Sequence, residues 1–430
     1  MLFLTLASAF TFAICLGLLA HTYAIFPLLM DRLTRGRQLS PVPEQEDHEL
    51  PELAVLMAVY NEESVLKRTL DSLASVDYPA DRFHVWIGSD GSTDRSREII
   101  ESYRGRILGL EFREFGGRNG KIRIINSLAE EARASFANPD SALFGMCDAN
   151  VAWAEDLPKT LARHFQRNEV GLVGTNVLDE TQNHSGIGHE EEAYVGRENR
   201  TKWAEGVLWG RTMGAFGACY AMRAQLFEAV PDHFIVDDFY STMSVLEQGH
   251  DAIVDLEAQS YEAVSSDIRE EFRRKKRIAT GNFQNLFHFR KLLWPLLGSR
   301  ETVFAFWSHK GLRWFGPILI IGMLLSTLAL SILTTWGWLL AAGILGSFAI
   351  AAVDAWFEKL KWAPHLKLFR FVRYFYSMNL ALLLGFFAFL RGGQNSVWEP
   401  TERVAHHRPG DDESENLAPL SGERRPIESA

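Results

Sequence analysis

The apolar residues of this chain gather in blocks near its two ends. The first charged side chain is Asp31, and the residues before it are rich in leucine, alanine and phenylalanine. A helix needs about 20 apolar residues to cross a hydrocarbon core of about 30 Å. Residues 1–31 therefore predict a transmembrane helix, so the chain combines membrane and water-exposed parts.

A secretory signal peptide is the alternative interpretation of this segment, but no basic residue precedes the apolar run and no small-residue cleavage site follows it. Arg32, Arg35 and Arg37 come directly after the run. By the positive-inside rule they place the following domain in the cytoplasm. We expect an integral protein of the cytoplasmic (plasma or inner) membrane, with the polar residues 38–50 as a linker.

A second apolar region lies toward the other end. No side chain is formally charged between Arg313 and Asp354, and residues 314–353 are long enough for a transmembrane hairpin. Residues 374–391 predict a further transmembrane helix, because a basic cluster suited to a cytoplasmic loop precedes them. Residues 404–430 are polar and predict a disordered tail.

An amphipathic pattern precedes the hairpin. Phe283, Leu286 and Phe287 recur at helical spacing close to Arg290 and Lys291. Residues 281–300 therefore predict an amphipathic helix in the membrane interface. A helix buried in a protein core gives the same pattern, and this alternative stays open.

Charge and cysteine content exclude several function classes. The formal net charge is -10, which argues against a nucleic-acid partner. Cys15, Cys147 and Cys219 are too scattered for a disulfide framework or a zinc site. The predicted spans contain no charged residues that would line a permeation path, which disfavours a transporter.

Residues 51–280 alternate between strand and helix patterns. Buried-strand runs lie at residues 53–60, 84–90, 107–115 and 142–149, and helical patterns lie at residues 65–73, 96–103 and 121–132. This alternation predicts an α/β fold with a mixed, mostly parallel sheet and helices on both faces. In such sheets ligands bind at the carboxyl ends of the strands.

Polar clusters stand at these strand ends. Tyr60 and Glu62 end the first strand, Asp90 lies in an SDGSTD turn, and Lys121 opens a helix after an RNG sequence. Asp148 and Asn150 end the fourth strand in the sequence DAN. An Asp-Gly turn alone is commonplace, but four clusters at one sheet edge predict a shared binding crevice.

Taken in this order, the motifs resemble those of family 2 glycosyltransferases, whose GT-A fold is Rossmann-like. The resemblance continues through GAFGACYAMR at 214–223, Asp237-Asp238, Arg274-x-x-Arg277, SHKGLRW at 308–314, and the segment of Gln394 and Trp398. Membrane-anchored relatives are similar to polysaccharide synthases of the cellulose, chitin and poly-N-acetylglucosamine type, and to transferases acting on lipids. The resemblance implies an inverting enzyme that moves a sugar from a nucleotide-sugar, a UDP-sugar, to a growing polysaccharide or a membrane lipid.

The resemblance also implies roles for individual residues. Asp238, with Asp237 beside it, is the implied catalytic base, which takes the proton of the attacking hydroxyl. The implied donor-binding residues are Tyr60, Glu62, Asp90, Lys121 and Asp148. Arg274 and Arg277 are implied to contact the diphosphate or the acceptor, and Asp148 and Asn150 to hold Mg²⁺ or Mn²⁺.

Two positions depart from the family pattern. Asn150 stands where a second acid is usual, which weakens the attraction for a metal ion. Ile278 stands where a tryptophan usually stacks on a sugar of the acceptor chain, which favours a lipid acceptor over processive synthesis. A non-processive transferase acting on polyprenyl phosphate or a glycolipid, and a weakly catalytic scaffold that binds nucleotide-sugars, are the alternatives. An accessory membrane subunit also stays open.

Simpler interpretations accompany several motifs. The basic run at 273–277 suits anionic headgroups, and the acids at 237–238 suit a helix N-terminus. The polar stretch at 181–192, with His184 and His189, predicts a solvated loop. Glu198, Lys202 and Glu205 either form ion pairs or contact an acceptor.

One conflict concerns topology. With the N-terminus outside, four crossings put Gln394 and Trp398 outside, whereas the resemblance places them at a cytoplasmic active site. One apolar segment lying in the interface would remove the conflict.

Overall fold

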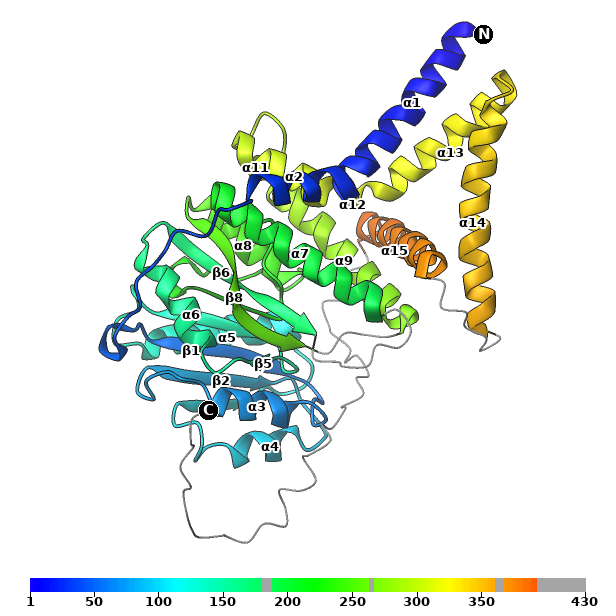
Figure 1. The fold of residues 1–430 in the computed structure, drawn as a ribbon. Helices are drawn as coiled ribbons and strands as arrows, with labels where there is room; N and C mark the ends of the chain where they lie inside the picture. The colour runs from blue at the N-terminus through cyan, green and yellow to red at the C-terminus, as the bar shows by residue number, and fades with distance from the viewer. Residues whose placement is uncertain (180–187, 263–266, 360–366, 393–430) are drawn as a thin grey trace, which may run out of the picture.

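The computed structural model describes residues 1–179, 188–262, 267–359 and 367–392. A sheet covered by helices forms one part, and long apolar helices from both ends of the chain extend away from it (Figure 1). The predicted α/β fold class with apolar helices at both ends is therefore confirmed. We refer to the sheet and its covering helices as the sheet domain.

The described residues contain one mixed sheet with the strand order β3-β2-β1-β4-β7-β6-β8-β5. Its strands are β1 (Leu53–Val59), β2 (Phe83–Ser89), β3 (Leu110–Glu114), β4 (Leu143–Cys147), β5 (Ala152–Trp153), β6 (Val170–Asp179), β7 (Cys219–Arg223) and β8 (Asp251–Glu262). β1 pairs in parallel with β2 and β4, β2 with β3, and β6 with β8. β7 runs antiparallel between β4 and β6, so the sheet is mixed, as expected.

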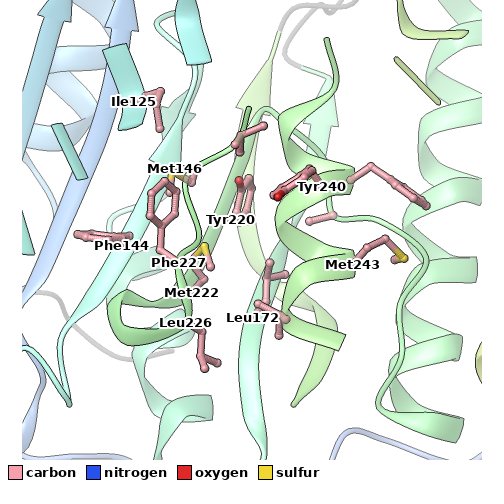
Figure 2. Close-up of a cluster of buried hydrophobic side chains, with 14 of the residues drawn as sticks. Ile125, Phe144, Met146, Leu172, Tyr220, Met222, Leu226, Phe227, Tyr240 and Met243 are labelled. Atoms are coloured by element: carbon pink, nitrogen blue, oxygen red, sulfur yellow. The ribbon is translucent and has the colours of Figure 1, made fainter. Parts of the chain in front are cut away.

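Helices cover both faces because each has an apolar side. They are α3 (Leu66–Ala74), α4 (Ser96–Ser102), α5 (Lys121–Ser135), α6 (Leu157–Arg163), α7 (Gly188–Trp209), α8 (Asp237–Glu247) and α9 (Ile268–His288), with short turns η2 (Asp47–Glu49), η3 (His164–Gln166) and η4 (Ala224–Leu226). Leu66, Leu70 and Leu73 recur at helical spacing and are buried in the core of one face. Ile125 of α5 and Tyr240 of α8 belong to the core of the other (Figure 2).

The apolar helices are long enough to cross a membrane. They are α1 (Leu2–Ala20), continued by η1 (His21–Ile25) and α2 (Phe26–Leu33), then α13 (Gly316–Leu333), α14 (Gly337–Lys359) and α15 (Lys367–Leu390). The candidate spans by length and composition are Leu2–Leu33, Gly316–Leu333, Gly337–Phe357 and Lys367–Leu390. Large apolar side chains such as Phe10, Leu328 and Leu339 are exposed on them, as a lipid-facing surface requires.

A single helix over residues 281–300 is not found. α9 begins at Ile268, inside the range predicted for the sheet domain, and ends at His288. α10 (Arg290–Leu293), α11 (Arg300–Phe306), η5 (Trp307–Gly311) and α12 (Leu312–Trp314) follow. Phe283 and Leu286 are buried in the core of the sheet domain, whereas Phe287 is half exposed. The core alternative is therefore correct for this part of α9.

The predicted loop at 181–192 also differs from the structure. α7 begins at Gly188, so His189 and residues 190–192 are helical. Glu191 is buried and pairs with Lys275 of α9 at 3.3 Å. Burying the carboxylate against a lysine stabilises helix where the sequence shows only polar residues. His184, Gln394, Trp398 and the tail at 404–430 lie outside the described residues.

Candidate active site

Most of the predicted site residues line one cavity of about 2090 Å³. These are Glu62, Lys121, Asp148, Asn150, Asp237, Asp238, Arg274 and Arg277. They come from the ends of β1 and β4 and from helices α5, α8 and α9. The carboxyl-end crevice expected from the strand pattern therefore exists, although Tyr60 and Asp90 are not among its lining residues.

Lys121 lies at the centre of the charged residues. Its Nζ is 2.8 Å from Asp148 Oδ1 and 3.2 Å from Asp237 Oδ2. Burial would lower the pKa of Lys121, but the two carboxylates outweigh burial and hold the pKa well above its usual value. A charged ammonium thus links the end of β4 to the start of α8.

Asp90 contacts the loop that leads to Lys121. Its side chain is buried, and it accepts hydrogen bonds from the Gly120 backbone N–H at 3.1 Å and from Arg118 Nε at 3.1 Å. The Arg118 guanidinium carbon lies 3.3 Å from the centroid of the Tyr60 ring. The expectation that Asp90 opens into the same crevice as Asp148 and Asp238 is not met, because the loop leading to Lys121 takes up its oxygens.

Asp238 lies where the cavity wall is tightly packed. Its Oδ1 accepts a hydrogen bond of 2.7 Å from the Phe239 backbone N–H. A Cβ added at Gly217 would lie 3.1 Å from Asp238 Oδ2, so the glycine allows this close approach. Burial and then the charge of Asp237 raise the pKa of Asp238, while Lys202 opposes them. A carboxylate with a raised pKa on a cavity wall suits a proton acceptor.

The residues predicted to hold a metal supply hard oxygen atoms. Asp148 offers its carboxylate, and Asn150 donates its Nδ2 to Glu262 Oε1 at 3.1 Å, which leaves its amide oxygen for a cation. Within the described ranges no group of three or more His, Cys, Asp or Glu side chains is arranged to hold a metal ion. The pair fits magnesium or manganese only when a bound diphosphate supplies further ligands.

The two arginines of α9 differ in their pairing. Arg274 is 3.5 Å from Glu271, whereas Arg277 is exposed to the cavity and has no carboxylate partner among the described residues. Ile278, where the resemblance implies a tryptophan, also lines the cavity. Arg277 is therefore the arginine whose charge is available to an anion.

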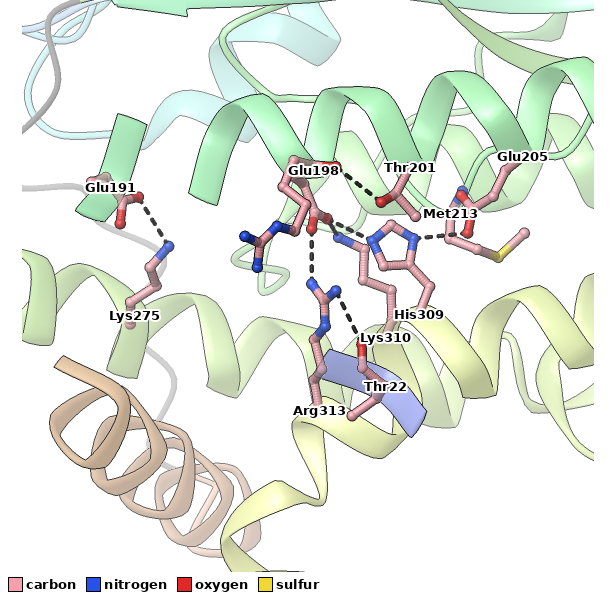
Figure 3. A network of polar contacts seen from close by, with 11 residues as sticks. Thr22, Glu191, Glu198, Thr201, Glu205, Met213, Lys275, His309, Lys310 and Arg313 are labelled. Atoms are coloured by element: carbon pink, nitrogen blue, oxygen red, sulfur yellow. Dashed lines mark hydrogen bonds and ion pairs between the residues drawn. The ribbon is translucent and has the colours of Figure 1, made fainter. Parts of the chain in front are cut away.

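A buried network that the sequence did not predict lies beside this cavity (Figure 3). Glu198 of α7 is 2.9 Å from Arg313, and it also pairs with Lys310 and His309. Glu205 accepts from His309 Nδ1 at 2.8 Å. Burial would raise the pKa of Glu198, but its cationic neighbours hold it well below its usual value. The ion pairs expected among Glu198, Lys202 and Glu205 on one helix are not found; Glu198 and Glu205 pair instead with residues that are distant in the sequence.

This network joins the sheet domain to the apolar helices. Arg313 donates to the backbone oxygen of Thr22, in the first span, at 3.4 Å, and His21 Nε2 is 3.0 Å from Ser308 Oγ. The motif SHKGLRW and the run of Glu198, Lys202 and Glu205 are separate in the sequence, and pairing across more than a hundred residues leaves no periodic pattern that would join them.

Side chains of the candidate spans line another part of the cavity. Most of them are apolar, such as Leu16 of α1, Met323 of α13 and Phe375 of α15, and Lys367 and Arg370 of α15 also line the cavity. One continuous space therefore reaches from the charged cluster around Lys121 to the helices that carry the candidate spans.

Comparison with family models gives two overlapping matches. Residues 54–230 match the model described as glycosyl transferase family 2, and residues 150–357 match glycosyl transferase family group 2. Together the matches include the sheet domain and the hairpin of α13 and α14.

Among curated relatives, a beta-monoglucosyldiacylglycerol synthase of Synechocystis is 30% identical over 125 residues, which are 29% of this chain and 25% of that enzyme. A poly-beta-1,6-N-acetyl-D-glucosamine synthase of Staphylococcus epidermidis is 27% identical over 135 residues, which are 31% of this chain and 30% of that enzyme. The matched segments thus span less than a third of either relative.

A solved structure shares the fold over most of the chain. The mannosyltransferase PcManGT from Pyrobaculum calidifontis, in complex with GDP-Man and Mn²⁺, matches 88% of this chain and 99% of its own, with a TM-score of 0.61 and 20% identity. At this identity the likeness establishes the GT-A fold.

Proposed function

This chain belongs to glycosyl transferase family 2, and on that premise we propose that it transfers a sugar from a UDP-sugar to a membrane lipid. The transfer inverts the configuration at the anomeric carbon. We further propose that the enzyme acts at the cytoplasmic face of the membrane, which the arginines after the first span support.

The observation that carries this proposal is the continuity of the cavity. Its polar end holds Lys121, Asp148 and Asp238, and its other end is walled by side chains of α1, α13 and α15. A lipid acceptor needs both environments, because its tail stays among apolar side chains while its hydroxyl must reach the donor. Ile278 supports the same choice, since an isoleucine offers no aromatic face to a glycan chain.

In the proposed reaction, Asp238 accepts the proton of the acceptor hydroxyl as that oxygen attacks the anomeric carbon. The bond from this carbon to the diphosphate breaks on the opposite side, so the configuration inverts and the nucleoside diphosphate leaves. Lys121, Arg274 and Arg277 stabilise the negative charge that develops on the leaving group. Asp237 holds Lys121 in place through the 3.2 Å ion pair.

We also propose a divalent cation, Mg²⁺ or Mn²⁺, held by Asp148 and Asn150. Such an ion, when bound, neutralises charge on the diphosphate of the donor. The Mn²⁺ in the nucleotide-sugar complex of the Pyrobaculum structure supports this choice. Glu62 lines the cavity on the side of β1 and is a donor-binding candidate; Tyr60 and Asp90 act through the loop that leads to Lys121.

A growing polysaccharide is the second candidate acceptor. The poly-N-acetylglucosamine synthase among the relatives supports it. The two candidates differ in product size, because a lipid acceptor receives one sugar and a glycan acceptor is extended. A scaffold that binds the donor without turnover, and dependence on an accessory membrane subunit, are the remaining outcomes that an assay separates.

The test is an assay of purified protein in lipid nanodiscs with a panel of nucleotide-sugars and added Mg²⁺ or Mn²⁺. We expect UDP release from one sugar donor and a lipid product heavier by one sugar in mass spectra. A ladder of products would support the polysaccharide candidate. Donor binding without any UDP release, with or without membrane extract, would support the scaffold and contradict the proposed function.

A further inference from the structure

Lys202 is a buried lysine that the proposed reaction does not use. It lies on α7, is 3% exposed, and lines the cavity. Its ammonium lies 3.5 Å from the centroid of the Phe216 ring. Within the described residues it has no hydrogen-bond or ion-pair partner, unlike Lys121, Lys275 and Lys310, which all contact carboxylates.

An unpaired ammonium in such a place is costly. Removing a charge from water without a partner is unfavourable, and contact with an aromatic face offsets only part of that cost. Burial, followed by the charge of Lys310, lowers the pKa of Lys202 to about 7, against the opposing effect of Glu198 and Asp238. A bound anion would remove this cost and keep Lys202 charged.

The position of Lys202 indicates which molecule supplies the anion. Lys202 and Asp238 line the same cavity, the Lys202 ammonium lies over the ring of Phe216, and the next residue, Gly217, lies against Asp238. The donor diphosphate already has Lys121 and Arg277 in the proposed reaction. The helix that carries Lys202 is joined by Glu198 and Arg313 to the first span, on the acceptor side.

We propose that Lys202 binds a phosphate of the acceptor, so that the acceptor is an anionic lipid with its reacting hydroxyl next to a phosphodiester. This inference rests on the proposed function and narrows its substrate class. The hydroxyl is required because Asp238 must have a proton to accept. The phosphate would lie beside Lys202, and the tail would lie among α1, α13 and α15.

Binding measurements test the inference without turnover. Short-chain phosphatidylglycerol carries both a hydroxyl and a phosphodiester, whereas short-chain diacylglycerol carries the hydroxyl alone. Each is titrated into the detergent-solubilised full chain by calorimetry, and UDP is titrated separately. We expect wild type to prefer phosphatidylglycerol, and Lys202→Met to weaken its binding roughly tenfold or more, as loss of a charged hydrogen bond predicts.

Matched variants complete the experiment. Lys202→Arg keeps the charge and should restore most of the binding. Lys291→Met makes the same change at an exposed lysine of α10 outside the cavity and should bind phosphatidylglycerol like wild type. Unchanged UDP binding reports that Lys202→Met is folded.

Three results would overturn the inference. They are equal binding of the two lipids by wild type, unchanged phosphatidylglycerol binding in Lys202→Met, and a loss confined to UDP, which would assign Lys202 to the donor. Failure of the proposed function would be seen in the transfer assay instead, where wild-type reactions would contain no sugar-bearing lipid.

Discussion

At the scale of single residues, the chemistry depends on the ionisation of Asp238. We predict that Asp238→Asn lowers the rate of sugar transfer about 10²–10⁴-fold, because an amide cannot accept the proton of the hydroxyl. UDP binding, measured by calorimetry, should stay at the wild-type level. A variant that keeps more than a tenth of wild-type turnover would exclude Asp238 as the base.

The raised pKa of Asp238 also predicts how the rate of sugar transfer depends on pH. Burial and Asp237 raise the pKa of Asp238 above the ordinary value of 3.8. The base works only when deprotonated, so the rate should fall as the pH is lowered through this raised pKa. A profile of kcat against pH should therefore show its acidic limb above pH 3.8. A rate that stays constant down to that pH would contradict the assignment.

A substitution at Gly217 should also lower the rate, because this glycine lies against Asp238. In Gly217→Ala the new Cβ would lie 3.1 Å from Asp238 Oδ2, and the carboxylate must shift by a few tenths of an ångström. We expect about a tenfold loss of kcat, since small displacements of a catalytic group are costly. Gly105→Ala is the control, because no atom lies within 4 Å of its added Cβ. Equal activity of the two variants would show that Asp238 tolerates the displacement.

The sequence predicted which residues lie near the site better than it predicted where their side chains point. The motif order placed Lys121, Asp148 and Asp238 at one crevice, and the structure has them lining one cavity. Asp90 follows its strand as predicted, but its oxygens point to the loop at 118–120. A strand-end carboxylate can face a ligand or its own neighbouring loop, and the sequence pattern is the same for both.

At the scale of elements, α7 depends on its buried pairing with η5 and α12. We predict that Glu198→Gln destabilises the protein by about 3–5 kcal/mol, because Lys310, Arg313 and His309 lose a shared carboxylate in a buried place. Thermal melting in detergent should show a decrease of about 5 °C or more. Glu114→Gln, which removes an exposed ion pair with Arg97, is the control and should melt close to wild type.

The pH dependence of this difference follows from the lowered pKa of Glu198. A carboxyl group whose pKa is lower in the folded state stabilises the fold above its unfolded pKa and loses that effect as the pH falls through its folded pKa. The gap in melting temperature between Glu198→Gln and wild type should be full at pH 7. It should narrow only below about pH 4.5, the ordinary value for glutamate. A gap that narrows near neutral pH would assign the stabilisation to another group.

The strands and helices before residue 150 could be predicted from periodicity, whereas several of those after it could not. The strand runs before residue 150 are continuously apolar because both faces of the central strands are covered. β6 and β8 mix polar and apolar positions, so no strand was predicted there. The start of α7 was missed because Glu191 is stabilised by Lys275, which is distant in the sequence.

At the scale of the whole molecule, the depth of α15 in the membrane depends on its contact with α9. α15 is apolar enough to be a candidate span, yet it lies along α9. Thr280 of α9 donates to the Gly385 backbone oxygen at 3.2 Å, and the rings of Phe283 and Phe386 are 4.8 Å apart. α15 therefore lies at the depth of α9 along much of its length.

α9 cannot enter the hydrocarbon core. Its first half has the sequence IREEFRRKKR, and each charged side chain costs about 3 kcal/mol at the centre of a bilayer. Two further contacts join α15 to the start of α13 and to the last turns of α14. Asn379 Oδ1 would be 2.8 Å from a Cβ at Gly316, where α13 begins, and Arg373 pairs with Asp354 near the end of α14. We therefore expect α15 to lie in the cytoplasmic interface, with three crossings before it.

Three crossings place the residues after α15 in the cytoplasm, which would remove the conflict over Gln394 and Trp398. The native cysteines are all buried, so single introduced cysteines can be labelled in cells with an impermeant maleimide. Thr335→Cys lies between α13 and α14, at the end of the molecule that also holds the N-terminus (Figure 1), and should react in intact cells. Ser396→Cys should react only after lysis, because α15 does not carry the chain across. Labelling of Ser396→Cys in intact cells would instead make α15 a fourth crossing and separate Trp398 from the active site.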